Sequence, residues 1–261
     1  MPTWHWLASL LGILAILLIE PGYREPLFNY SVDVYIPEKQ AVTEGMAIWD
    51  AYSNYCLPVV VLVPLATLAL WLGRGAERRR AFYYVAVLTA NVFVMNISKL
   101  WYHEPRPFWV SQGIETQSCS SEYGSPSGHS LLATAFTLAV WLDYNQAMSQ
   151  QRRDHEGSLV ALSSQTSSTD SNTCRTIMSL WHFRVVMLVF TLFFIATIGL
   201  SRVILGVHSL DQVLFGIQLG AWLALTMHFC FKGRIEANWD RIFDNRNGDT
   251  GTADNDDYTR G

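Results

Sequence analysis

Charged side chains are scarce in this sequence. Only 15% of its 261 residues are Asp, Glu, Lys or Arg, whereas 50% are hydrophobic; in an ordinary soluble domain about a quarter of the residues are charged. The formal net charge of −4 also lacks the basic excess that nucleic-acid binding requires. The composition therefore argues against a soluble domain and against a nucleic-acid partner.

Cysteine is sparse too, and its spacing excludes the common metal sites. The 4 cysteines form no Cys-x-x-Cys pair, and His and Cys show no ligand spacing. We therefore expect no metal and no cofactor. Cys56 and Cys119 fall on the side of the membrane that we place outside the cytoplasm, where a disulfide is permitted. Two free thiols are equally compatible with the sequence.

The sequence has long apolar stretches instead. Six of them approach the roughly 17–25 residues that a membrane-spanning helix needs. They are Trp4–Ile19, Leu57–Leu72, Ala81–Ser98, Pro126–Leu142, Val185–Leu200 and Gln212–Phe231. This pattern predicts an all-α fold, a polytopic helical bundle with six transmembrane helices in the bilayer. The first segment also has the length of a signal peptide, but it lacks a basic leader and a small-residue cleavage pattern, so we expect an uncleaved span.

Positive charge alternates between the connecting loops. One set of loops holds Arg74, Arg78, Arg79, Arg80, Arg152, Arg153, Arg175, Arg184, Lys232 and Arg234, and the other holds Arg24, Lys39, Lys99, Arg106 and Arg202. Because cytoplasmic loops carry the excess of Lys and Arg, both termini are predicted to be cytoplasmic. The loops after spans one, three and five are then luminal or extracellular, and Asn29 starts a glycosylation sequon in the first of them.

The sequence predicts one membrane domain without internal repeats. Residues 1–56 hold the first span and an outer loop, residues 57–231 form the membrane core, and residues 232–261 form a cytoplasmic tail. Within the core, residues 145–180 form a Ser/Thr-rich cytoplasmic loop. The loop and the tail are so polar that we expect both to be disordered.

Three groups of polar residues lie against the spans on the outer side. In the first, Lys99 ends the third span, and Arg106 follows on a stretch that Pro105 and Pro107 keep from forming a continuous helix. Ionisable residues at such a depth are costly and mark function by default. The alternative is a pair of cations that extend to the membrane interface beside aromatic neighbours.

The second group is the run Pro126-Ser127-Gly128-His129, just before the fourth apolar core. Pro126 fits a helix start, and the free N–H groups of such a start attract phosphate. His129 is expected in the first turn, facing the same site. A plain helix cap with a neighbouring histidine explains the run equally well.

The third group joins the fifth and sixth spans. Arg202 follows the fifth span, and His208 and Asp211 lead into the sixth. Positions three apart share a helix face, so the carboxylate could orient the imidazole and leave its other nitrogen nucleophilic. A histidine with satisfied hydrogen bonds at the interface is the alternative reading of His208.

Taken together, the groups place two arginines, a lysine, helix-start N–H groups and two histidines on one membrane face. Arginine binds phosphate oxygens in a bidentate manner. One histidine can attack phosphorus while the other protonates the leaving oxygen. The combination predicts phosphoryl transfer.

These motifs resemble those of the type 2 phosphatidic acid phosphatase superfamily, which also includes the vanadium haloperoxidases: Lys-x6-Arg-Pro, Pro-Ser-Gly-His and Ser-Arg-x5-His-x3-Asp. The sequence matches in type and spacing from Lys99 to His208. It departs at the end, because Asp211 comes one residue early and Gln212 occupies the family's Asp position. The resemblance covers roughly residues 50 to 231, and the stretches around Arg106 and His129 are also similar to the glucose-6-phosphatases.

The resemblance implies a phosphate site and a set of catalytic residues. The residues that would bind the phosphoryl group are Lys99, Arg106, Ser127, Gly128 and Arg202. The catalytic residues would be His208 as the nucleophile that forms a phosphohistidine, Asp211 as the group that orients it, and His129 as the general acid. The resemblance requires no metal, because cationic side chains supply the charge stabilisation.

The implied activity is metal-independent hydrolysis of a phosphate monoester in the endoplasmic reticulum or plasma membrane, with a lipid phosphate such as phosphatidate as the favoured substrate. A sugar phosphatase of the glucose-6-phosphatase type, a polyprenyl diphosphate phosphatase, a vanadate-dependent haloperoxidase and a non-catalytic anion-binding membrane relative remain alternatives. Six spans favour the lipid phosphatases, because the glucose-6-phosphatases carry more spans and the known haloperoxidases are soluble.

Overall fold

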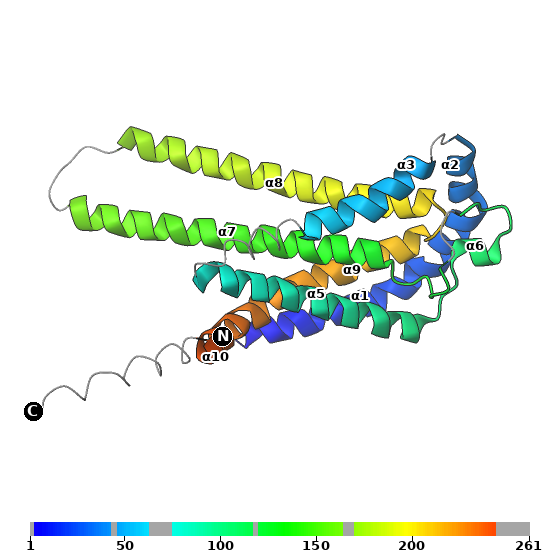
Figure 1. Cartoon of the computed structure of the whole chain (residues 1–261), viewed down its shortest axis with the longest axis horizontal. Coiled ribbons are helices and arrows are strands. Elements are labelled where there is room, and N and C mark those ends of the chain that lie inside the picture. The colour runs from blue at the N-terminus through cyan, green and yellow to red at the C-terminus, as the bar shows by residue number, and fades with distance from the viewer. Residues whose placement is uncertain (1–2, 43–45, 63–74, 117–119, 164–169, 244–261) are drawn as a thin grey trace, which may run out of the picture.

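The structure is a computed structural model that describes residues 3–42, 46–62, 75–116, 120–163 and 170–243. Every element in these ranges is helical, and the long helices run along a common axis (Figure 1). The elements are α1 (Trp4–Tyr30), the π-helical η1 (Ser31–Tyr35), α2 (Ile36–Val42), α3 (Met46–Ala51), the π-helical η2 (Tyr52–Cys56), α5 (Gly75–Tyr102), α6 (Pro107–Val110), α7 (Gly128–Ser163), α8 (Asp170–Ile204), α9 (Leu210–Thr226), the π-helical η3 (Met227–Phe231) and α10 (Lys232–Phe243). Helix continues past η2 through residue 62.

Helix α9 packs against α7, α1, α8 and α5. Its closest approach is to α7, at two glycines one turn apart. A Cβ atom on Gly216 would come within 2.7 Å of the backbone oxygen of Ser127, and one on Gly220 within 2.6 Å of that of Leu131. Small residues permit such close contact between membrane helices. This seam holds the beginning of α7 against the beginning of α9.

Within the ranges that the structure describes, four helical runs are long and apolar enough to cross a membrane. They are Trp4–Val42, Arg78–Val110, Trp181–Ile204 and Leu210–Trp239. Large apolar side chains such as Leu18, Phe93 and Phe193 are exposed on these runs, as expected of helices whose solvent is lipid. The protein is therefore an integral membrane protein.

The predicted count of six spans is not confirmed. The fourth predicted span falls on the beginning of α7, which is not among the four runs. Its inner side buries Ser130, Thr134 and Asp143, because α7 is packed against α5, α8 and α9. The second predicted span, Leu57–Leu72, is described only as far as residue 62.

Two segments predicted to be loops are helical. Residues 145–163 extend α7 and residues 170–180 begin α8, where the sequence predicts a disordered loop. Good helix formers in the run "QQRRDHEGSLVAL" favour the extension of α7.

Asn29, predicted on an outer loop, lies exposed in the last turn of α1. The tail beyond residue 243 and Cys119 lie outside the described ranges, so the disorder of the tail and the pairing of Cys56 stay predictions.

The ends of the helices define two ends of the bundle. The last turns of α5 and α8 and the first turns of α7 and α9 meet at one end, beside α2 and α6 (Figure 1). The start of α1 lies at the other end with α10: the Trp6 ring is 5.0 Å from that of Phe231 and 5.1 Å from the Arg234 guanidinium carbon. The three polar groups found in the sequence therefore lie at the end opposite to the start of α1.

Candidate active site

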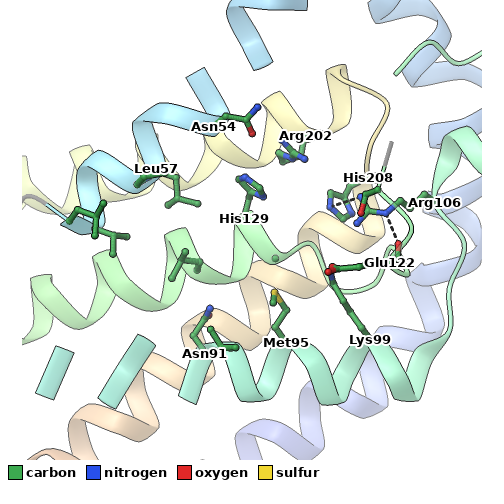
Figure 2. A pocket seen from close by; sticks show the side chains of 17 residues that line it. Asn54, Leu57, Asn91, Met95, Lys99, Arg106, Glu122, His129, Arg202 and His208 are labelled. Atoms are coloured by element: carbon green, nitrogen blue, oxygen red, sulfur yellow. Dashed lines mark hydrogen bonds and ion pairs between the residues drawn. The ribbon is translucent and has the colours of Figure 1, made fainter. Parts of the chain in front are cut away.

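A cavity of about 610 Å³ lies at the end of the bundle that carries the three polar groups, between α5, α7, α8 and the helix that follows α3. Members of all three sequence groups line it. The polar side chains in its wall include Lys99, Arg106, His129, Arg202 and His208, and the apolar ones include Leu57, Val61, Val92, Met95 and Leu132 (Figure 2). The polar and apolar residues occupy different parts of the same cavity.

The end of α5 and the stretch after it bring the first two cations to the cavity. Lys99 lies in the last turn of α5 and is only 8% exposed. Arg106 has extended backbone (φ −81°, ψ 152°) just before α6, as the flanking prolines require. Its Nη1 donates to the backbone oxygen of Val207 at 3.1 Å. That bond holds the guanidinium beside the α8–α9 connection.

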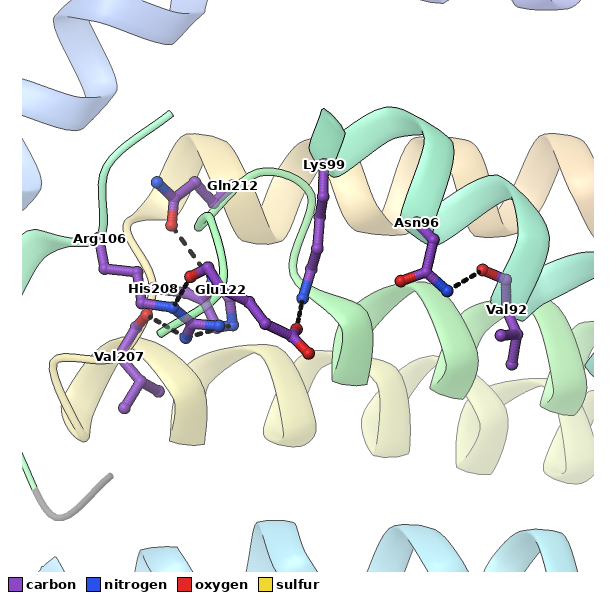
Figure 3. A network of polar contacts seen from close by, with 8 residues as sticks. All are labelled: Val92, Asn96, Lys99, Arg106, Glu122, Val207, His208 and Gln212. Carbon is purple, nitrogen blue, oxygen red and sulfur yellow. Dashed lines mark hydrogen bonds and ion pairs between the residues drawn. The ribbon is translucent and has the colours of Figure 1, made fainter. Parts of the chain in front are cut away.

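Glu122 also lines this cavity, although no motif in the sequence indicated it. Its carboxylate forms an ion pair with Lys99 Nζ, and its backbone oxygen accepts a 2.7 Å hydrogen bond from Arg106 Nε (Figure 3). The hydrogen bond and charge of Lys99 hold the pKa of Glu122 below its usual range. The Glu122 side chain is 62% exposed, so its carboxylate is paired with Lys99 from the solvent side of the cavity.

The beginning of α7 differs from the prediction in one respect. The Ser127 N–H, expected to be free for a phosphate, donates to the backbone oxygen of Gln212 at 2.9 Å. The Ser127 hydroxyl accepts a 3.1 Å hydrogen bond from Ser130. The wall of the cavity is instead formed by Gly128 and His129, whose N–H groups have no partner within the helix. A Cβ on Gly128 would approach Met95 Sδ to 2.6 Å, so a larger residue at this position would displace the flexible Met95 side chain.

Gln212 fixes the orientation of His208. Its amide nitrogen donates to the Pro105 backbone oxygen at 2.8 Å, so its Oε1 points the other way. Oε1 accepts the Ser209 N–H at 3.4 Å and lies 3.2 Å from His208 Nδ1 (Figure 3). An amide oxygen only accepts, so this network assigns the proton to Nδ1. The lone pair is then on Nε2, which lies 3.4 Å from Arg106 Nη1.

His208 is neutral in this environment. The residue lies in the short connection between α8 and α9 and is 2% exposed. Burial lowers its pKa well below the usual value, and the charges of Arg106 and Arg202 lower it further. The side chain therefore presents an unprotonated nitrogen to the cavity at neutral pH.

The orienting position belongs to Gln212 and not to Asp211. Asp211 is 2% exposed, and its Oδ1 has no hydrogen-bond partner within the described structure. His208 lies just before the N-cap residue of α9, Ser209. Its ring therefore contacts Gln212, the third residue of the helix, whose side chain folds back toward the N-cap. The three-residue spacing that suggested Asp211 applies within a helix, whereas His208 lies before one.

Arg202 and His129 complete the cavity from α8 and α7. Arg202 is 5% exposed, and its Nη1 donates to the Ser53 hydroxyl at 2.9 Å. Its Nε has no hydrogen-bond partner within the described structure. Figure 2 shows the His129 ring extending from the first turn of α7 toward Arg202.

Cations dominate the charge of the cavity. Among the described residues, Lys99, Arg106 and Arg202 line it, against one lining carboxylate, that of Glu122. Buried charges are normally paired, so an excess of buried donors is suited to an anionic ligand. Within the described ranges, no group of three or more His, Cys, Asp or Glu side chains is arranged to hold a metal ion.

Comparison with known proteins gives the family. The family model of the PAP2 superfamily matches residues 80–236, more than half of the chain. The chain belongs to the PAP2 superfamily. Among solved structures, it is similar to a transmembrane PAP2-type phosphatidylglycerolphosphate phosphatase from Bacillus subtilis, with a TM-score of 0.57, 16% identity, and coverage of 88% of this chain and 96% of that one. No curated protein matches the sequence.

Proposed function

We propose that the protein hydrolyses a lipid phosphate monoester through a phosphohistidine on His208. The observation that carries this proposal is the environment of His208 Nε2. The nitrogen is unprotonated, lies 3.4 Å from Arg106 Nη1, and opens on a cavity that Lys99 and Arg202 also line. A nucleophile beside clustered cations is suited to a phosphoryl group.

The first step forms the phosphoenzyme. His208 Nε2 attacks phosphorus, and the bond from phosphorus to the lipid alcohol oxygen breaks. Burial and the neighbouring cations lower the pKa of His129 to about 3. The bound phosphate dianion offsets those positive charges, so His129 takes up a proton in the complex and gives it to that oxygen. The ring of His208 becomes cationic, and Gln212 Oε1 continues to accept the Nδ1–H. Arg106 and Arg202 stabilise the charge on the phosphoryl oxygens.

The second step releases inorganic phosphate. His129, now neutral, takes a proton from water, and the resulting hydroxide attacks phosphorus. The phosphorus–nitrogen bond breaks, and His208 returns to its neutral Nδ1–H form. In this scheme Lys99 exchanges Glu122 for a phosphoryl oxygen, Gly128 admits the phosphate to the start of α7, and Gln212 is a positioning residue. Ser127 holds the start of α7 against Gln212 and supports the site indirectly.

A lipid is the favoured substrate class because the cavity continues from the cations into apolar side chains. The solved relative is titled a phosphatidylglycerolphosphate phosphatase, which agrees with a lipid phosphate. The motif end of the bundle is opposite to the start of α1 and α10. With both termini in the cytoplasm, as the loop charges predict, the active site opens on the luminal or extracellular side of the endoplasmic reticulum or plasma membrane.

Phosphate release by purified protein in detergent with EDTA tests the proposal. The panel contains phosphatidate, phosphatidylglycerolphosphate, a polyprenyl diphosphate and glucose 6-phosphate. We expect release from a lipid monoester, and acid-labile labelling of His208 after a short reaction with a ³²P-labelled substrate. Release from glucose 6-phosphate alone would reject the lipid, and turnover without labelling would reject the phosphohistidine.

A further inference from the structure

Two carboxyl groups lie next to the residues that hold His208, and each keeps an oxygen that nothing bonds. Glu104 lies just after α5, and Asp211 lies in the first turn of α9 and is 2% exposed. Glu104 Oε2 and Asp211 Oδ1 are buried and have no hydrogen-bond partner within the described structure. Unpaired buried polar atoms are rare enough in native proteins to need a reason.

The two carboxyl groups belong to chain segments that are bonded to each other. The amide nitrogen of Gln212 donates to the Pro105 backbone oxygen at 2.8 Å. Asp211 directly precedes Gln212, and Glu104 directly precedes Pro105, so the same bond brings the two acidic residues together. Their side chains interact with each other directly.

The surroundings of the pair supply no bonded cation. The charged and titratable groups that face it from α1 and α5 are Glu20, Tyr23, Arg24 and Tyr102. Arg24 Nε lies 3.6 Å from the carboxylate of Glu20, which is 2% exposed, so Arg24 is engaged there and acts on Glu104 only from a distance. Among the described residues, none forms an ion pair with Glu104 or Asp211. Two adjacent buried carboxyl groups without a cation do not both ionise.

Resting on the phosphatase function proposed above, we propose that Glu104 and Asp211 share one proton and act together as positioning residues for His208. The proton lies in an O–H···O hydrogen bond between Glu104 Oε2 and Asp211 Oδ1, and it satisfies both unpaired oxygens at once. This bond holds the segment of Pro105 against that of Gln212, whose Oε1 lies 3.2 Å from His208 Nδ1.

The shared proton makes the orientation of His208 sensitive to alkaline pH. Raising the pH removes the proton and leaves two carboxylates that repel each other. As Glu104 and Asp211 separate, the hydrogen bond from Gln212 to Pro105 is lost, and His208 Nδ1 loses its acceptor. Attack by Nε2 on phosphorus then slows.

Infrared spectroscopy of the purified protein in detergent tests for the proton. A protonated carboxyl group has a C=O stretching band that a carboxylate lacks. We expect wild type to show this band at neutral pH, where exposed carboxyl groups are ionised, and Glu104→Gln and Asp211→Asn each to lose intensity in it. Glu25→Gln is the control, because it alters an exposed carboxyl group on α1. A band that neither variant weakens overturns the proposal.

Phosphate release from micellar phosphatidate tests the positioning role. An amide at position 104 donates an N–H to Asp211 in place of the shared proton, whereas Leu has no donor. We expect Glu104→Leu to lower kcat about tenfold, the effect of one buried hydrogen bond. Glu104→Gln should keep most of the activity and extend the alkaline limb of kcat to higher pH. His129 is unaltered in both variants, so a shift of the limb reports on the pair.

Two outcomes would overturn the positioning role. Equal losses in Glu104→Leu and Glu104→Gln with an unmoved alkaline limb would show that Glu104 acts only in packing. Wild-type kcat and pH profile in both variants would remove the pair from the reaction. A wild-type protein that releases no phosphate from any lipid overturns the proposed function itself, whereas the infrared band still decides whether the proton is shared.

Discussion

The bundle buries charge at both of its ends, but in different ways. At the end away from the cavity, Asp143 of α7 is ion-paired with Lys232 of α10 and lies 3.6 Å from Arg80. The Tyr84 hydroxyl donates to Asp143 at 2.7 Å, and Lys232 also donates to Gln146 at 2.8 Å. At the cavity, no carboxylate among the described residues is bonded to Arg202, and its Nε has no hydrogen-bond partner there.

The difference separates a structural cluster from a ligand site. Asp143 and His129 lie on the same helix, about 21 Å apart, so the two clusters share α7 and its packing partners. In one, opposite charges satisfy each other and join α5, α7 and α10. In the other, three cations face one carboxylate among the described residues, that of Glu122, which is 62% exposed. Under the proposed function, a bound phosphate balances this excess of buried positive charge.

Loss of the nucleophile should have the largest effect. His208→Gln is expected to lower kcat by about 10⁴-fold or more, because no other group can form the phosphoenzyme. The matched substitution His228→Gln alters a histidine outside the cavity and should leave kcat near the wild-type value. Phosphate release from micellar phosphatidate measures both. Comparable losses in the two variants would contradict the assignment.

Removal of a cavity cation should come next. Arg202→Met is expected to lower kcat/KM on the order of 10²–10³-fold through lost stabilisation of the phosphoryl oxygens. Thermal stability in detergent should stay unchanged or rise, because the variant removes a buried charge with no bonded carboxylate. Normal turnover together with a lowered Tm would place Arg202 in a structural role.

The same substitution at the other end should have the opposite pattern. Lys232→Met leaves Asp143 buried without its closest partner, which typically costs about 3–5 kcal/mol of unfolding free energy. Tm should fall, whereas kcat per folded molecule should not. The double variant Lys232→Met with Asp143→Leu should recover much of the loss, since no charge is left unpaired. If kcat falls without a change in Tm, the contrast between the two clusters is wrong.

The pH dependence reports on Gln212. Burial and the two arginines lower the pKa of His208, so the neutral nucleophile persists as pH falls and the acid limb of kcat/KM should lie below pH 6.5. Gln212→Glu puts a carboxylate beside Nδ1, favours the imidazolium and should move that limb to higher pH. Asp211→Asn should not move it. Two substrates with different phosphate pKa values identify any limb that belongs to the substrate.

The smallest effect is expected at the carboxylate that occupies Lys99. Glu122→Gln removes the competing anion, so KM should fall a few-fold, roughly as expected for one exposed ion pair, with little change in kcat. Because the pKa of Glu122 is held below its usual range, the wild-type competition should persist to mildly acidic pH. A raised KM would show instead that Glu122 positions Lys99 for the substrate.

The site residues were predictable where the motif is local. Lys99, Arg106, His129 and His208 are close to apolar runs in the sequence, and the structure brings them into one cavity. Gln212 could have been found from its four-residue spacing to His208. Glu122 could not, because the role of an exposed loop carboxylate depends on which side chains pack beside it.

The sequence by itself determined the membrane class, the all-helical fold and the family motifs, because these depend on hydrophobic length and on local residue order. The number of spans was not determined in this way. Helix α7 packs against three other helices and carries Ser130, Thr134 and Asp143 on its buried side, so the hydropathy of its sequence alone does not decide whether it crosses the membrane. Only the tertiary structure decided that Gln212 holds His208, that Ser127 is already bonded, and that one buried charge cluster is satisfied while the other is not. Those outcomes depend on which atoms distant parts of the chain bring within hydrogen-bonding distance, and residue order alone does not specify that.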